Sequence, residues 1–144
     1  MKYILILLIY VCITSIHHKD NLMVEKIVSY RSFYKAGTTA LLKNVFEFPL
    51  RYNIDTAFKY VKDKDIDDFE YILNNAKVCK HKQMKINVDL ALIVTILNKE
   101  HYFIISESSY IIVDLTTNLN YKLNTIELQE KSKKFVQNVI NIYE

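Results

Sequence analysis

The sequence predicts an α+β fold in which two helices pack on one face of an antiparallel β-sheet. Three strongly apolar runs, residues 89–97, 101–106 and 110–115, have the length and composition of strands. The connections between them are only a few residues long, which predicts antiparallel hairpins and therefore a meander. Two amphipathic stretches, about 65–77 and 125–142, flank this meander. Such segregation of helices from strands is typical of α+β domains rather than of alternating βαβ units.

The first half of the chain carries weaker strand signals. MVEKIVSYRSF, residues 23–33, is the first strand candidate, and it ends shortly before Gly37. Residues 38–60 are ambiguous, because 39–45 fits a strand or a short helix and Pro49 is compatible only with an edge strand or a bend. TAFKYV, residues 56–61, is typical of another short strand.

Both helices carry terminal signals. Asp65 is the expected N-cap of the first helix, with Asp67 and Asp68 in the first turn, where the helix dipole favours negative charge. Asn124 is the expected N-cap of the second helix, and Glu127 three residues later completes a capping-box pattern. YKL, residues 121–123, is a candidate fourth strand between the meander and the second helix.

Alternation along the meander assigns its side chains to two faces. One face is wholly apolar and should meet the helices: Leu90, Leu92, Val94, Ile96, Phe103, Ile105, Ile111, Val113 and Leu115. The opposite face is half apolar where an open antiparallel sheet would be polar. It predicts a binding patch for a protein partner or a second copy of the chain, formed by Tyr102, Tyr110, Ile104 and Ile112. The alternative is that segment 38–60 covers this face.

Composition and length limit the classes of function. The chain has 144 residues and 51% hydrophobic residues, enough for one domain with a core. Its net charge of +3 is too small to indicate nucleic-acid binding, so none is expected. The single glycine, Gly37, excludes a glycine-rich phosphate loop.

The N-terminus has the parts of a secretory signal peptide. Lys2 precedes an apolar run from Tyr3 to Ile13, which is shorter than a membrane span, and small residues Thr14 and Ser15 follow. We therefore expect residues 1–15 to be a signal peptide and 16–144 to be the mature domain, exported to the periplasm, the cell surface or the medium. An uncleaved membrane tether is the alternative, and Cys12 leaves lipidation open.

Candidate chemical sites are sparse. Cys79, His81 and His101 do not supply the ligand set of a zinc site, and no spacing around Cys79 favours a reactive thiolate. Asp63, Asp65 and Asp67 lack the glycine and glutamate that a calcium loop needs after them. No metal, cofactor or catalytic residue is predicted.

From residue 55 to 143 the order of elements resembles small exported or lipoprotein-type bacterial α+β domains of unknown function, the YhfM-like type. The shared features are a short strand, the helix DIDDFEYILNNAK, a basic loop, the meander and a last helix. The resemblance implies this fold and export, and it carries no catalytic residue.

These observations predict a small exported, non-enzymatic domain that binds a protein or another macromolecule, of inhibitor, immunity or accessory type. One alternative is a thiol or hydrolytic enzyme that uses Cys79 and a histidine. The other is a membrane-tethered accessory protein that retains its N-terminus.

Overall fold

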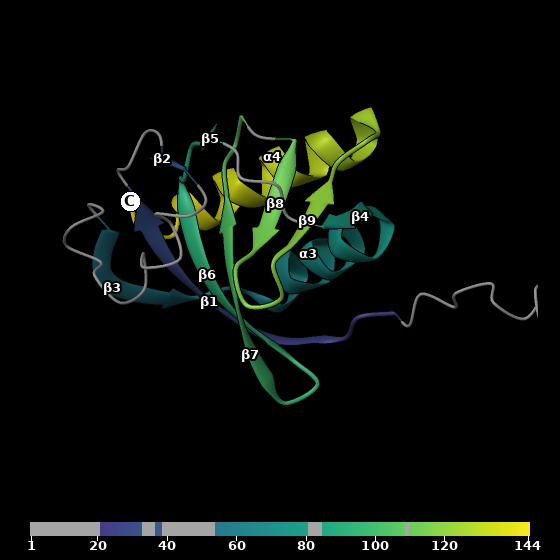
Figure 1. Ribbon diagram of the computed structural model, residues 1–144. Helices are drawn as coiled ribbons and strands as arrows, with labels where there is room; N and C mark the ends of the chain where they lie inside the picture. Colours follow the sequence, from purple (N-terminus) through teal and green to yellow (C-terminus); the bar gives the residue numbers. More distant parts are fainter. Residues whose placement is uncertain (1–20, 33–36, 39–53, 81–84, 109) are drawn as a thin grey trace, which may run out of the picture.

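The computed structural model describes residues 21–32, 37–38, 54–80, 85–108 and 110–144. Over these residues the chain has the predicted α+β fold, with a seven-stranded antiparallel sheet and two helices. Both helices lie behind the sheet in Figure 1, so the sheet has a helix side and an outer side. The expected signal peptide, residues 1–15, and Pro49 lie outside the described residues.

The large sheet has the strand order β3-β1-β6-β7-β8-β9-β4, and β2 and β5 form a separate two-stranded ribbon. The predicted strands 89–97, 101–106 and 110–115 correspond to β6, β7 and β8, although β7 begins two residues earlier than predicted, and the predicted fourth strand, 121–123, overlaps β9. The strands are β1 Val24–Ser32, β2 Gly37–Thr38, β3 Ile54–Tyr60, β4 Lys77–Lys80, β5 Lys85–Ile86, β6 Leu90–Ile96, β7 Lys99–Ile105, β8 Ile111–Asp114 and β9 Leu119–Lys122. Strands β2, β4 and β5 had no strand signal, because each is short and β4 is rich in lysine.

The hairpin between β6 and β7 turns on Leu97 and Asn98, which both adopt positive φ, 49° and 61°. Positive φ at both central residues is the geometry of the tight hairpin turns that match the twist of antiparallel strands. Glu25 Oε1 accepts a hydrogen bond from the Asn98 amide at 3.0 Å and ties this turn to β1. The turn therefore lies earlier than the predicted connection: β6 ends at Ile96, one residue before its predicted end, and β7 begins at Lys99, two residues before its predicted start.

The main core lies between the sheet and the two helices. Phe69 of helix α3 (Asp63–Asn75) meets Phe135 of helix α4 (Ile126–Ile140) with ring centroids 5.0 Å apart, and it meets Phe103 of β7 edge-on at 5.6 Å. All three rings are almost fully buried. Aromatic pairs of this kind add to the free energy gained from burial, so this contact locks both helices onto the centre of the sheet.

Helix α3, Asp63–Asn75, begins two residues before the predicted start. Its N-cap is Lys62, which makes no side-chain cap hydrogen bond, and the prediction of Asp65 as N-cap was wrong. Asp65 is instead buried inside the helix and accepts a hydrogen bond from Asn138 Nδ2 of α4 at 2.8 Å. Asp65 therefore serves a contact between the two helices, whereas the local sequence pattern alone predicted a helix cap.

Helix α4, Ile126–Ile140, is capped by Thr125 rather than by Asn124. The Thr125 hydroxyl accepts from the Leu128 amide at 3.2 Å, which satisfies one of the free amides at the helix start. The predicted cap was one residue early, an error typical of capping patterns when two polar residues are adjacent.

The chain is anchored near both ends of its described part. Asn74 of α3 both donates to and accepts from the backbone of Leu22, at 2.9 and 2.8 Å. Near the C-terminus, the Tyr143 hydroxyl donates to the carbonyl of Ser29, a buried residue of β1. These contacts fix β1 against the helices at two points, and β1 is the strand that carries much of the outer-side surface described below.

Candidate functional site

The outer side of the sheet carries rows of side chains that the strand register fixes. Residues directly paired across antiparallel strands project on the same side. One row runs across four strands as Tyr60, Val28, Ile93 and Tyr102. The neighbouring row runs as Phe58, Tyr30, Ala91, Ile104 and Val113.

Four aromatic side chains of these rows form what we call the aromatic patch: Tyr30, Phe58, Tyr60 and Tyr102. The Tyr30 and Phe58 ring centroids are 6.4 Å apart, and Phe58 meets Tyr60 edge-on at 5.5 Å. Phe58 and Tyr60 are 50% and 58% exposed, whereas Val28 and Ile93 between the tyrosines are half-buried. Phe58 and Tyr60 are thus two exposed rings in contact, and the half-buried Tyr30 and Tyr102 extend the aromatic surface across the sheet.

Two opposite charges border the aromatic patch. Lys26 Nζ lies 4.8 Å from the centre of the Tyr60 ring, a cation–π distance. Glu100 on β7 accepts a long hydrogen bond of 3.5 Å from the Tyr102 hydroxyl. Burial raises the pKa of Tyr30, and the nearby groups of Glu100, Tyr102 and Tyr60 raise it further. The aromatic patch is therefore amphipathic, because it combines apolar rings and phenol hydroxyls with a lysine and a glutamate at its border.

Only part of the predicted patch lies on this surface. Tyr102 is half-buried and belongs to the aromatic patch. Ile104 lies on the same side but is fully buried in a second small cluster, where Ile86 and Val88 cover it together with Ala91 and Val113. Residues 86–88 thus close one end of the outer side. The proposal that Ile104 offers exposed apolar surface was wrong.

Ile112 was assigned to the wrong side of the sheet. Strand β8 pairs with β7 so that Ile104 faces Val113, which leaves Ile112 in the core beneath the helices with no exposure. Ile111, Val113 and Leu115, expected toward the helices, pack instead against the outer cluster. The prediction assumed that the β7–β8 connection keeps odd-numbered residues of both strands on the same side of the sheet. A difference of one residue in that length inverts every side chain of the following strand.

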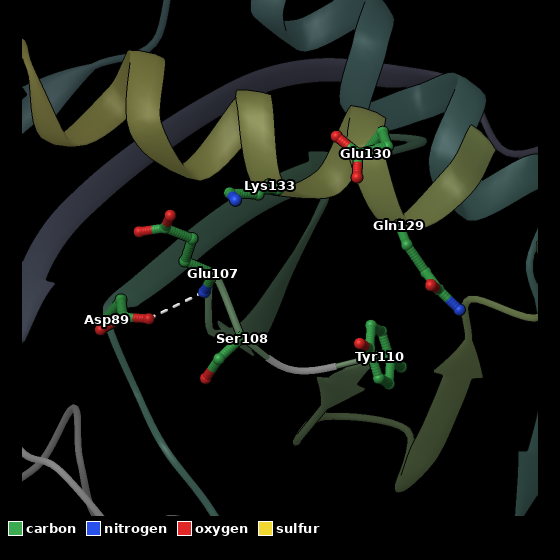
Figure 2. A pocket seen from close by; sticks show the side chains of 7 residues that line it. All are labelled: Asp89, Glu107, Ser108, Tyr110, Gln129, Glu130 and Lys133. Atoms are coloured by element: carbon green, nitrogen blue, oxygen red, sulfur yellow. Dashed lines mark hydrogen bonds between the residues drawn. The ribbon is translucent and has the colours of Figure 1, made fainter. Parts of the chain in front are cut away.

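Tyr110 does not belong to the aromatic patch either. It precedes β8, is 63% exposed, and lines a polar cavity of about 460 Å³ beneath α4. Figure 2 shows it there with Gln129, Glu130 and Lys133 of α4 above the loop that carries Glu107. Asp89 at the floor accepts from the Glu107 amide at 2.7 Å and from the Ser106 hydroxyl at 2.8 Å. Asp89 thereby holds the β7–β8 loop in place, which is a structural role.

Sequence reasoning missed Tyr30, Phe58 and Tyr60. The signal was present in the alternation of VSY in β1 and FKY in β3, which places Val28 with Tyr30 and Phe58 with Tyr60 on one side of each strand. What the alternation does not give is the neighbour of each strand. The pairing β3-β1-β6-β7 is what brings these residues beside Tyr102.

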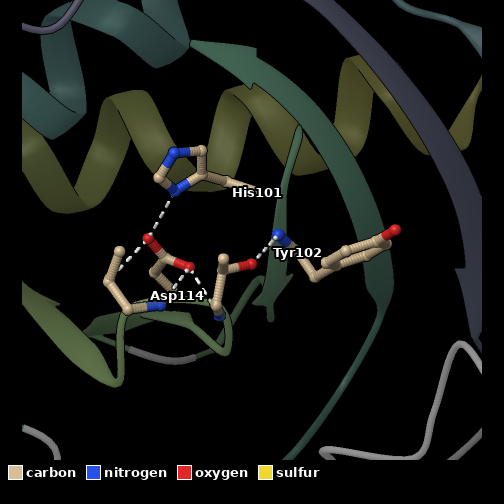
Figure 3. A network of polar contacts seen from close by, with 5 residues as sticks. His101, Tyr102 and Asp114 are labelled. Atoms are coloured by element: carbon tan, nitrogen blue, oxygen red, sulfur yellow. Dashed lines mark hydrogen bonds and ion pairs between the residues drawn. The ribbon is translucent and has the colours of Figure 1, made fainter. Parts of the chain in front are cut away.

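A polar network surrounds Asp114, a buried carboxylate on the helix side of the sheet (Figure 3). It accepts from His101 Nδ1 at 3.0 Å, from the Thr116 amide at 2.8 Å and from the Thr117 hydroxyl at 2.6 Å. The Thr117 amide adds a bond of 3.2 Å. Oδ1 accepts from both amides of the β8–β9 turn, where Asn118 has a positive φ of 57°, and Oδ2 is shared by His101 and the Thr117 hydroxyl.

The structure does not bring Cys79 and His101 together. Cys79 pairs with Asn120, which pairs with Val113 of the outer cluster, so its side chain lies on the outer side. His101 pairs with Val94 of the helix-side core and stacks on Phe103, with ring centroids 6.3 Å apart. The Cys79 thiol donates to the Asn120 carbonyl at 3.6 Å. A thiol–imidazole pair of these two residues is excluded by the sheet between them, and His81 lies outside the described residues.

Within the described ranges, no group of three or more histidine, cysteine, aspartate or glutamate side chains is arranged to hold a metal ion. In the same part of the chain, no helix is long and apolar enough to cross a membrane. No family model, curated protein or solved structure matches the chain.

Proposed function

We propose that this protein is an exported, non-enzymatic domain that binds a protein partner through the aromatic patch. The observation that carries the proposal is the set of exposed rings of Phe58 and Tyr60 beside the half-buried Tyr30 and Tyr102. Tyrosine combines a large apolar ring with a polar tip at low cost in conformational entropy, and it is therefore enriched at protein interfaces.

The charges around the patch favour a protein over the other classes of macromolecule. Single-stranded nucleic acid needs stacking rings along a positively charged groove. Among the described residues, Lys26 and Glu100 border the rings with opposite charges and do not form a positive track along them. An aromatic centre with a polar rim is the arrangement of protein interfaces.

Export rests on the N-terminal pattern of Lys2, an apolar run and small residues, and on the resemblance to YhfM-like exported domains. A secreted domain with a single remaining cysteine obtains its stability from its core instead of a disulfide. The core between the sheet and the helices, with three almost fully buried phenylalanines, is consistent with that requirement.

The test compares the same substitution, tyrosine to alanine, at two positions inside the aromatic patch and at one position outside it. The protein is isolated from its host in the form the host produces, and proteins cross-linked to it are identified and purified. Tyr60→Ala and Tyr102→Ala should each raise the dissociation constant about 30-fold, which corresponds to the roughly 2 kcal/mol that a central aromatic anchor contributes. Tyr110→Ala is the matched control, because Tyr110 is equally exposed but lies beside α4.

Binding that is unchanged in Tyr60→Ala and Tyr102→Ala, with both proteins folded by circular dichroism, would show that the partner does not use the aromatic patch. Loss of binding in Tyr110→Ala alone would place the interface at the α4 cavity instead.

A further inference from the structure

The β4–β9 edge of the large sheet is built from two segments of sequence that contain lysine but no acidic residue. Residues 71–88 include β4, and residues 115–126 include β9; neither segment has an aspartate or a glutamate. Strand β4 lies at the end of the sheet and pairs along its whole length with β9. The lysines of the two segments therefore meet at one edge without an acid from either strand between them.

Three exposed lysines form what we call the lysine edge: Lys77, Lys80 and Lys122. Lys77 is paired directly with Lys122, and both project on the outer side, because Lys122 is also paired with Ile111 of the outer cluster. Like charges directly across a ladder repel each other. Among the described residues, the ion pairs use other cations, so the three lysines have no ion-pair partner there.

Lysines on an edge strand also discourage an incoming strand. That role does not explain why Lys77 stands opposite another lysine. A glutamate opposite Lys77 would protect the edge as well and would add an attractive pair in place of a repulsive one. A bound anion, in contrast, relieves the repulsion between Lys77 and Lys122, so the pair is suited to an anionic ligand.

The charges point to both sides of the edge. Lys80 is paired with Leu119, which packs against the main core, and it therefore projects on the helix side. Val78, 37% exposed, lies between Lys77 and Lys80 on the same strand. The sheet thus presents its positive charges edge-on, which suits a broad negatively charged surface better than a single ion.

The N-terminal part of the chain reaches the protein beside this edge. Asn74, three residues before Lys77, holds the backbone of Leu22 through hydrogen bonds of 2.8 and 2.9 Å. Figure 1 shows the first described residues passing the end of α3 from which β4 continues. The apolar run that ends at Ile13 precedes Leu22 by nine residues, which span at most about 30 Å. While that run is inserted in a bilayer, the lysine edge is therefore held close to the lipid headgroups.

We infer that the lysine edge docks onto the surface of an anionic phospholipid bilayer. Basic residues near a bilayer surface are attracted to anionic lipids, and the attraction increases with each lysine. Single-stranded nucleic acid would require aromatic rings among the lysines, whereas β4 has Val78 there. This inference goes beyond the proposed function, because the aromatic patch on β3, β1 and β7 is a separate surface.

Co-sedimentation with vesicles tests the inference on the chain as its host produces it. The vesicles are phosphatidylcholine alone or phosphatidylcholine mixed with phosphatidylglycerol. The partition coefficient should be about 100-fold higher for the anionic vesicles, since each of the three lysines contributes about 5-fold. Lys77→Gln with Lys122→Gln should lower this preference about 25-fold, and high salt should abolish it. Lys77→Arg with Lys122→Arg should keep it.

The matched control is Lys64→Gln with Lys134→Gln, which removes the same charge from exposed positions of α3 and α4 and should leave the preference unchanged. Circular dichroism checks that every variant is folded. Equal binding to both kinds of vesicle, or an equal loss in the control, would overturn the inference. Release from the vesicles by inorganic phosphate, but not by chloride of the same ionic strength, would overturn it in favour of a site for a soluble anion. Tyr60→Ala should not change the preference, so failure of this inference and failure of the proposed function are distinguishable.

Discussion

Replacing Asp114 by alanine should be among the most destabilising single changes on the helix side of the sheet. Its carboxylate is 1% exposed and accepts four hydrogen bonds, from one side chain of β7 and from two residues of the following turn. Alanine removes every acceptor at once and leaves the donors in place. The loss in free energy of unfolding therefore depends on how well water can replace the carboxylate as the acceptor for each donor.

The donors differ in their access to solvent. His101 has a side-chain exposure of 19%, so its Nδ1–H group would be left largely unpaired, and a hydrogen bond to a charged group is worth about 1.5–3 kcal/mol. Thr116 and Thr117 are exposed, and their amides can bind water, so each loss costs at most about 0.5–1 kcal/mol. Together these give about 2.5–5 kcal/mol for Asp114→Ala. Asp114→Asn keeps one acceptor oxygen for the turn and should cost about half as much.

Urea unfolding followed by circular dichroism measures these free energies, with equal m-values as the check on two-state behaviour. Asp67→Ala, an exposed acid of α3, is the control and should stay within about 0.5 kcal/mol of the wild type. A double-mutant cycle with His101→Ala should show coupling above about 0.5 kcal/mol. If Asp114→Ala unfolds at the wild-type urea concentration, the network does not stabilise the hairpin and the reasoning fails.

Four further changes test other parts of the molecule. Intact mass of the protein from its own host should show loss of residues 1–14 or 1–15, whereas a full-length cytosolic product would contradict export. Cys79→Ala should keep partner binding, because Cys79 lies on β4, at the opposite edge of the sheet from the β3 rings, and its thiol contacts only a backbone carbonyl among the hydrogen bonds described; loss of binding in a folded variant would contradict this. Leu97→Gly should raise the unfolding free energy by about 1 kcal/mol, because Leu97 has a φ of 49°, which strains a residue with a Cβ atom and does not strain glycine. Leu97 is 62% exposed, so the substitution removes little buried surface, and an unchanged urea midpoint would show that the backbone is not strained there. Burial, assisted by Asp114, raises the pKa of Tyr121 to about 12. The unfolded chain therefore releases that proton first, and stability present below pH 10 should fall between pH 10 and 12, by up to about 1.4 kcal/mol per pH unit. Tyr121→Phe should flatten that fall in urea titrations and the exposed Tyr110→Phe should not; an equal slope in both would refute the assignment.

The sequence was most informative where structure is local. Strong apolar runs located β6, β7 and β8, and helical spacing located α3 and α4 to within two residues at their starts. Alternation also identified the buried side of β6 and β7, including Leu90, Leu92 and Phe103, because two adjacent side chains of a strand cannot face the same side. These features follow from the geometry of a few consecutive residues.

The tertiary structure decided what depends on residues far apart in the chain. The side on which Ile112 and Val113 project was set by the length of the β7–β8 connection, since one residue more or less inverts the whole strand. The aromatic patch exists only because β3, β1, β6 and β7 are neighbours in the sheet, although Tyr30 and Tyr102 are distant in sequence. The order of strands in the sheet depends on pairing between distant segments, and the alternation of side chains within one strand does not reveal its neighbours. Alternation alone therefore predicted a tyrosine-bearing surface around Tyr102, and the sheet replaced Tyr110 with Tyr30, Phe58 and Tyr60 as its neighbours.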